Sequence, residues 1–125
     1  MNLQSEMNKP VLLTEGGGTM SLREFKNIRL NAMNESTFMR ALGTKDVAFA
    51  NQRVELYPVD QSRRLAVARL RASPEEKFEF IDGKVFSAVE AIKEIERDSA
   101  AGKYFTDLER RAAAIAIKAV EEGKA

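Results

Sequence analysis

The stretch Phe78-Glu79-Phe80-Ile81-Asp82-Gly83-Lys84-Val85-Phe86 decides how the middle of this chain folds. Apolar and polar residues alternate with period two on both sides of the central Asp82-Gly83 pair. This dipeptide favours the positive φ angles of a type I′ turn, whose twist matches two antiparallel strands. We therefore predict a β-hairpin over residues 78–86, with a short second strand because a helix begins directly after it.

Two earlier segments also have the pattern of strands. Residues 53–57 alternate and then stop at a proline, which cannot donate to a sheet ladder. Residues 63–71 are ambiguous: Leu65 and Val67 alternate with small or charged residues, but Arg, Leu and Ala are also good helix formers. We assign 63–71 to a strand because it lies between two clearer ones, and so predict an antiparallel meander of three to four strands across residues 53–86.

Helices are predicted on both sides of this meander. Ser21-Leu22-Arg23-Glu24 has the sequence of a capping box and opens a helix that runs to about Met33. A second short helix is expected between Ser36 as its cap and Gly43 just after its end.

The C-terminal part is predicted as a helical hairpin. Its first helix opens at the capping box Ser87-Ala88-Val89-Glu90 and ends near Ala101, before Gly102. Its second opens at the capping box Thr106-Asp107-Leu108-Glu109. The predicted fold class is therefore α+β: two short N-terminal helices, the meander, and a C-terminal helical hairpin packed on one face.

Residues 1–19 differ in composition from the rest of the chain. They contain the apolar patch Val11-Leu12-Leu13 and three consecutive glycines, whose backbone entropy disfavours any regular element. We predict a flexible tail over 1–19 and a single domain over 20–125. Codons for Glu15-Gly16-Gly17 can spell a ribosome-binding sequence, so Met20 is a candidate native start; the intact mass of the protein from its host tests this.

Composition limits the chemistry that this chain can perform. Its 125 residues include no His, Cys or Trp, which removes the commonest general base, thiol nucleophile and soft metal ligands. Apolar residues make up 44% and charged residues 31%, enough for one core without a disulfide. No apolar run approaches the roughly 20 residues of a membrane span, and no signal-peptide pattern is present, so we expect a cytoplasmic protein without a membrane partner.

No residue pattern supports a catalytic, cofactor or metal assignment. Glu90, Glu94 and Asp98 share a helix face and could hold a divalent cation, but the intervening Lys93 and Arg97 favour a solvated surface. The glycines lack the continuation of a phosphate loop or a dinucleotide fingerprint. We therefore predict that the chain is not an enzyme.

The last helix carries the predicted protein interface. Residues 112–120 are apolar nearly all the way round, which indicates burial on several sides. The helix is either buried within its own domain or part of a subunit contact. Because a terminal helix of a small domain is rarely surrounded by its own chain, we expect a homo-oligomer contact in preference to full internal burial. Its predicted residues are Ala113, Ile115, Ala116, Ile117 and Val120.

The leading prediction is a non-catalytic protein-binding module: a small adaptor, inhibitor or assembly factor of the kind that phages and plasmids encode. The alternative is a nucleic-acid-binding regulatory protein, because residues 20–71 carry ten basic and five acidic residues. On strand and helix surfaces these would form a basic stripe for phosphate contacts. The candidate residues are Arg23, Lys26, Arg63, Arg64, Arg69 and Arg71.

Overall fold

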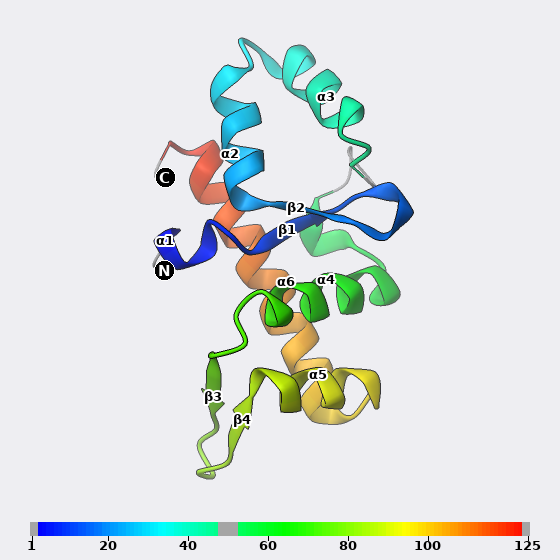
Figure 1. The fold of residues 1–125 in the computed structure, drawn as a ribbon, viewed down its shortest axis with the longest axis vertical. Helices are drawn as coiled ribbons and strands as arrows, with labels where there is room; N and C mark the ends of the chain where they lie inside the picture. The colour runs from blue at the N-terminus through cyan, green and yellow to red at the C-terminus, as the bar shows by residue number, and fades with distance from the viewer. Residues whose placement is uncertain (1–2, 48–52, 124–125) are drawn as a thin grey trace.

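The computed structural model describes residues 3–47 and 53–123, which form six α-helices, two short 3-10 helices and two antiparallel two-stranded sheets. The longest element, α6 (Ala100–Glu121), runs along most of the molecule, and elements from the N-terminal and middle parts of the chain pack against it (Figure 1). As predicted, the fold is α+β and the C-terminal helices α5 (Ala88–Glu96) and α6 pack together. No helix in this part of the chain combines the length and the apolar character needed to cross a bilayer.

The N-terminal residues form a hairpin whose first strand is buried. A single-turn helix, α1 (Leu3–Glu6), precedes β1 (Pro10–Leu13), which pairs antiparallel with β2 (Thr19–Ser21). The glycines form the connection, η1 (Glu15–Gly17), in which Gly16 and Gly17 have φ of 81° and 93°. All four residues of β1 are buried. Residues 3–19 are therefore not the loose tail that we predicted, because their apolar patch is a core strand.

Two hydrophobic clusters make up the core. The N-terminal cluster joins β1, β2, α2 (Leu22–Asn31) and α3 (Glu35–Thr44) to the second half of α6. The hairpin cluster consists of the buried residues Ala66, Leu70, Ala88, Ala91, Ile95 and Phe105. It joins α5 and the first half of α6 to a second β-hairpin, whose Phe78 and Phe86 pack against it. Helix α4 (Val59–Arg71) contributes to both, with Leu65 in the first cluster and Ala66 in the second.

The predicted meander is wrong because residues 63–71 belong to α4. The buried side chains of this helix recur at alternating spacings of three and one: Ser62, Leu65, Ala66, Arg69 and Leu70. That spacing places them on one helix face, against α6 and β1. Residues 53–57 are not a strand either, since they contain the 3-10 helix η2 (Val54–Leu56).

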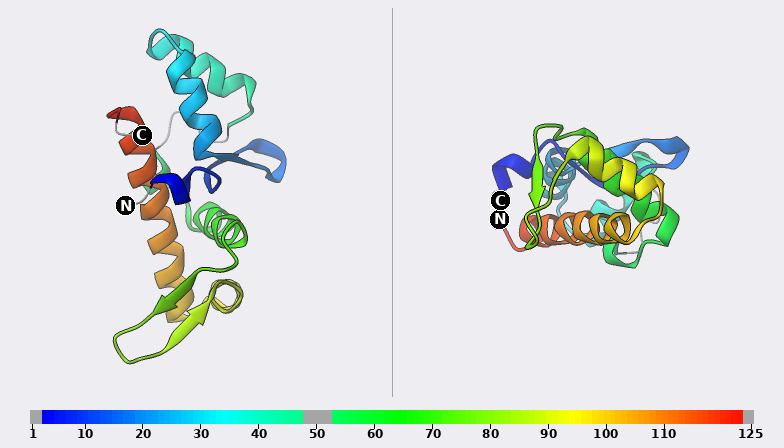
Figure 2. Two further views of the ribbon diagram at one scale, coloured as in Figure 1. Left: turned by 60° about the vertical axis from the view of Figure 1, so that its left-hand side comes forward. Right: turned by 90° about the horizontal axis from the view of Figure 1, so that it is seen from below.

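The predicted hairpin is present as β3 (Lys77–Glu79) and β4 (Val85–Ser87), with Phe78 opposite Phe86. Its turn extends beyond the helices (Figure 2). The turn differs from type I′, because Gly83 has a positive φ of 87° but Asp82 does not. The Gly83 amide donates to the Phe80 carbonyl at 2.9 Å, and the Phe80 amide donates to the Lys84 carbonyl at 2.8 Å. These bonds close a three-residue connection that ends in a left-handed glycine.

Most predicted helix starts are found at or near the expected residues. The Ser21 hydroxyl accepts from the Glu24 amide at 3.2 Å, and Ser87 and Glu90 form a complete capping box. Helix α3 begins two residues earlier than predicted, because the Asn34 side chain accepts from the Thr37 amide at 2.9 Å.

The predicted boundary at Gly102 is wrong, because α6 already begins after Ser99, whose hydroxyl accepts from the Gly102 amide at 3.0 Å. Thr106 does not open a helix; its hydroxyl donates to the Gly102 carbonyl inside α6. Glycine is required at 102 for close packing: a Cβ there would lie 2.0 Å from the Glu94 carbonyl oxygen of α5.

Candidate functional site

An apolar groove of about 890 Å³ lies between α3, η2 and the second half of α6. Leu12 of β1 and Phe25 of α2 contribute to its lining from the core side. On α3 the lining residues occupy positions i, i+3, i+4 and i+7: Glu35, Phe38, Met39 and Leu42. This spacing makes one face of α3 the first wall of the groove.

One face of α6 forms the opposite wall. Most of its lining residues also recur at helical spacing: Arg111, Ala114, Ile115, Lys118, Glu121 and Glu122. Ile117 completes this wall. At 1.5 Å per residue this wall is roughly 16 Å long, and the α3 wall is roughly 10 Å long. The groove is therefore an elongated slot between two helix faces. At its centre Ile115 is 54% exposed, a large apolar side chain in contact with solvent.

Charged side chains of both signs surround this slot. Arg111 pairs with Asp107 within α6, at 3.0 Å between Nε and Oδ2, and Arg53 pairs with Glu55 beside η2. At the start of α3, Glu35 accepts from Arg29 Nη1 at 2.9 Å. The Arg29 guanidinium also lies 4.4 Å from the centre of the Phe38 ring. These pairs are exposed, so each stabilises the fold by less than about 1 kcal/mol, and a partner could rearrange them.

The residues predicted as a protein interface divide into two groups. Ala113, Ala116 and Val120 are buried in the N-terminal cluster and are not available to a partner. Ile115 and Ile117 both line the groove, and Ile117 also packs against that cluster. The second half of α6 is thus internal core on one side and a groove wall on the other.

The residues predicted to contact nucleic acid do not form one stripe. Arg69 is buried, and Arg63 forms an ion pair with Asp98. Arg64 and Arg71 are exposed on α4, with Arg64 Nη1 bonded to the Gln61 side chain at 2.9 Å. On a helix, unlike a strand, residues 69 and 71 point to nearly opposite sides.

The remaining two candidates lie on α2, apart from the arginines of α4. Arg23 Nε donates to the Asn8 side chain at 3.3 Å, and Lys26 is half-buried. The basic surface that the sequence predicted is therefore divided between two helices.

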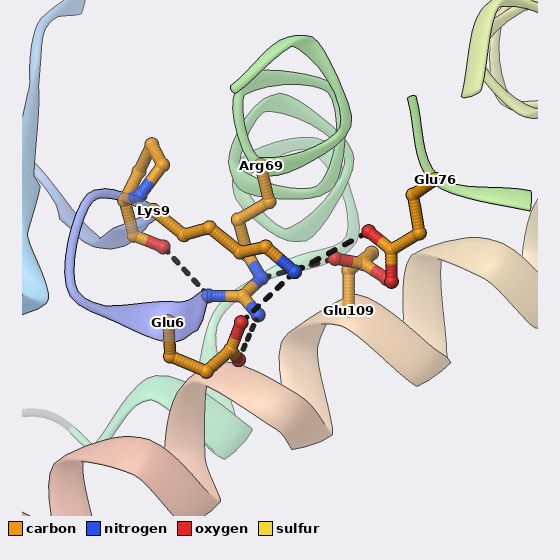
Figure 3. A network of polar contacts seen from close by, with 6 residues as sticks. Glu6, Lys9, Arg69, Glu76 and Glu109 are labelled. Atoms are coloured by element: carbon orange, nitrogen blue, oxygen red, sulfur yellow. Dashed lines mark hydrogen bonds and ion pairs between the residues drawn. The ribbon is translucent and has the colours of Figure 1, made fainter. Parts of the chain in front are cut away.

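The buried Arg69 is the centre of an ion network (Figure 3). Its Nη2 donates to Glu6 Oε1 at 2.7 Å, and its Nε donates to Glu109 Oε1 at 3.1 Å. Its Nη1 donates to the Pro10 carbonyl at 2.9 Å. Lys9 extends the network, with its Nζ 2.9 Å from Glu6 and 3.3 Å from Glu76. These contacts attach the N-terminal hairpin to α4 and α6.

The network changes the pKa values of its members in different directions. Burial acts to raise the pKa of Glu6, but Arg69 and Lys9 outweigh it and hold this pKa below its usual value. Burial acts to lower the pKa of Lys9, but Glu6 and Glu76 outweigh it and raise this pKa. Burial raises the pKa of Glu109, with a further contribution from Glu76, although Arg69 opposes the shift.

These charged groups are buried and bonded to one another. Arg69, Glu6 and Glu109 are at most 4% exposed, and each bonds to another member of the network. Within residues 3–47 and 53–123, no buried side-chain nitrogen or oxygen lacks a hydrogen-bond partner. The same part of the chain contains no group of three or more His, Cys, Asp or Glu arranged to hold a metal ion.

The acidic series on α5 is engaged in local contacts. Glu90 completes the capping box, Glu94 pairs with Arg97 at 3.1 Å, and Asp98 pairs with Arg63. Each of the three carboxylates is thus bonded to a neighbouring group.

Sequence reasoning missed the α3 wall and the burial of Arg69, although weak signals for both were present. Phe38, Met39 and Leu42 have the spacing of one face of the short helix predicted between Ser36 and Gly43. The buried positions of α6 are Gly102, Phe105, Glu109, Ala113, Ala116 and Val120, spaced by three or four residues. A carboxylate in such a series indicates a buried cation elsewhere in the fold.

The chain matches no protein-family model, and comparison with curated proteins and with solved structures gives no significant match.

Proposed function

We propose that this chain is a non-catalytic protein-binding module, a small adaptor, inhibitor or assembly factor, which binds its partner in the groove between α3 and α6. One observation carries the proposal: the two walls of the slot are faces of well-packed helices, with Ile115 half-exposed between them. Rigid apolar grooves of this shape suit the apolar face of a partner helix.

The composition of the groove agrees with that of protein interfaces. Its centre is apolar and includes Phe38 and Met39, residue types that are enriched in such contacts. Its edge is charged, as is usual for the rim of an interface. The volume of about 890 Å³ is close to the upper end of the range of roughly 300–1,000 Å³ for small-molecule pockets.

Nucleic-acid binding is the weaker alternative. The burial of Arg69 removes one of the six predicted phosphate contacts, and the ion pair with Asp98 weakens a second, Arg63. The remaining candidates lie on two separate helices, so they supply no continuous basic surface of the kind that tracks a phosphate backbone.

Affinity capture from native-host lysate tests this function. The tagged full chain is compared with Ile115→Asp and with Met33→Asp, a control at an apolar side chain that is 93% exposed and does not line the groove. Both substitutions are at exposed positions, so each should change stability by less than about 0.5 kcal/mol. Partner proteins should survive nuclease treatment with wild type and Met33→Asp but be lost with Ile115→Asp.

Two results would contradict the proposal. Partners that Ile115→Asp retains would show that the groove is not their binding site. Captured material that disappears on nuclease treatment would favour the nucleic-acid alternative instead.

A further inference from the structure

We propose that the occupant of the groove is α6 of a second copy of this chain, packed antiparallel to the first in a two-fold symmetric dimer. This inference rests on the proposed function and names the partner for the same groove. The charged and apolar residues along the α6 wall are ordered so that two copies of this wall match each other when they run in opposite directions.

The charges along this wall favour an antiparallel contact. From the start of the wall to its end, the residues are Arg111, Ala114, Ile115, Ile117, Lys118, Glu121 and Glu122, so the basic groups come first and the acidic pair comes last. When two copies of such a helix pack antiparallel, Arg111 lies opposite the partner's Glu121 and the partner's Glu122. The two-fold axis repeats the same contact at the other end. A parallel contact would instead place like charges together.

The centre of the wall supplies the apolar part of the contact. Ile115 is 54% exposed, and in the antiparallel arrangement it lies opposite the partner's Lys118. A lysine can cover an apolar side chain with its alkyl stem while its ammonium group stays in water. Ala114 beside it is small enough to let the two helix backbones approach closely.

The α3 wall would enclose the flank of the incoming helix. Phe38, Met39 and Leu42 face the groove from α3, opposite Ile115 and Ile117 of the same copy. Because a two-fold contact is isologous, each copy supplies both a groove and an inserted helix. The α3 wall therefore contributes to the interface once from each copy.

Sedimentation velocity of the purified full chain tests the dimer over a concentration range of about 1–100 μM. Wild type should change from the mass of one chain to that of two across this range. Arg111→Glu should weaken dimerisation by about tenfold or more, because it places like charges together at both ends of the contact. Ile115→Asp should weaken it to a similar extent.

The charge-swapped variant makes the test specific to this arrangement. Arg111→Glu combined with Glu121→Lys and Glu122→Lys restores opposite charges at both ends, so it should dimerise within about threefold of wild type. Glu96→Lys, at an exposed position of α5 outside the groove, is the control and should have no effect. Circular dichroism confirms that every variant is folded.

The outcomes separate this inference from the proposed function. A wild-type chain that stays monomeric, or a charge-swapped variant that does not recover, overturns the dimer. If the chain is monomeric but captured proteins are still lost with Ile115→Asp, the groove binds a helix of another protein, and only the dimer is overturned. If dimerisation persists in both Arg111→Glu and Ile115→Asp, it uses another face and the inference is wrong.

Discussion

Replacing Arg69 by Met should destabilise the fold by about 4 kcal/mol, a value within the roughly 3–5 kcal/mol expected when one partner of a buried ion pair is removed. Methionine fills most of the space but donates no hydrogen bond. Glu109 loses a charged donor at 3.1 Å, worth about 2–3 kcal/mol, and the Pro10 carbonyl loses one at 2.9 Å, worth about 1 kcal/mol. Glu6 keeps Lys9 at 2.9 Å, so its loss is smaller.

Urea unfolding measures this change. With slopes of about 1–3 kcal/mol per M for a small protein, the midpoint should fall by about 2 M. Arg71→Met, two residues away on the exposed side of α4, is the matched control and should change stability by less than about 0.5 kcal/mol. A second variant, Arg69→Met with Glu109→Gln, should recover about 2 kcal/mol, because it removes the charge that the first substitution leaves without a cation.

The reasoning is refuted if Arg69→Met destabilises the fold by less than about 1 kcal/mol at neutral pH, the range of an exposed ion pair. It is also refuted if Glu109→Gln gives no recovery in the Arg69→Met background. In that case the charge of Glu109 would not be the source of the loss.

Three further predictions follow from the fold. Gly102→Ala should destabilise the protein by about 2 kcal/mol or more in thermal unfolding, because its Cβ would lie 2.0 Å from a carbonyl oxygen of α5. Gly43→Ala, in open space within α3, should instead stabilise the protein by about 0.5–1 kcal/mol. Equal effects of the two substitutions on stability would contradict the close packing at Gly102. A chain that begins at Met20 should show no cooperative unfolding by circular dichroism, because it lacks the buried strand β1 and the ion-network residues Glu6 and Lys9. A cooperative transition would show that the N-terminal hairpin is dispensable for folding. The pKa of Glu6 is lowered in the fold, so the contribution of this carboxylate to stability is complete above the ordinary pKa of 4.5 and is lost as the pH falls below that value. Glu6→Gln should therefore lose less stability than wild type on acidification, as measured by urea unfolding between about pH 6 and 3.

The elements that were predicted correctly are those specified by local chemistry. The hairpin at Asp82-Gly83 and the caps at Ser21 and Ser87 depend on residues within about four positions of one another. The assignment of residues 63–71 to a strand failed because it relied on a neighbouring strand at 53–57, which instead contains the 3-10 helix η2. Arg69 was also not expected at a core position. Its counter-charges come from 63 positions earlier in the chain and 40 positions later, so no local pattern showed that burial of Arg69 was possible.

The candidate site was only partly predictable for the same reason. The sequence marked Ile115 and Ile117 as residues of an unusually apolar helix, and both line the groove. The sequence did not show which side of that helix faces the core, because this side is set by packing near β1. The strand β1 was itself not predicted, since its three apolar residues are followed by a run of glycines. Nor did the sequence bring α3 next to α6, because the residues of the two walls lie some 70 positions apart in the chain and meet only through tertiary packing.

Helix α6 follows the other described elements in chain order, which has a consequence for folding during synthesis. Both hydrophobic clusters include α6 residues, and Glu109 of the same helix completes the ion network. Until residues 100–121 have been made, neither cluster has its full set of apolar side chains, and Arg69 lacks Glu109, one of its two carboxylate partners. The two clusters and the ion network are therefore completed together, by the same helix.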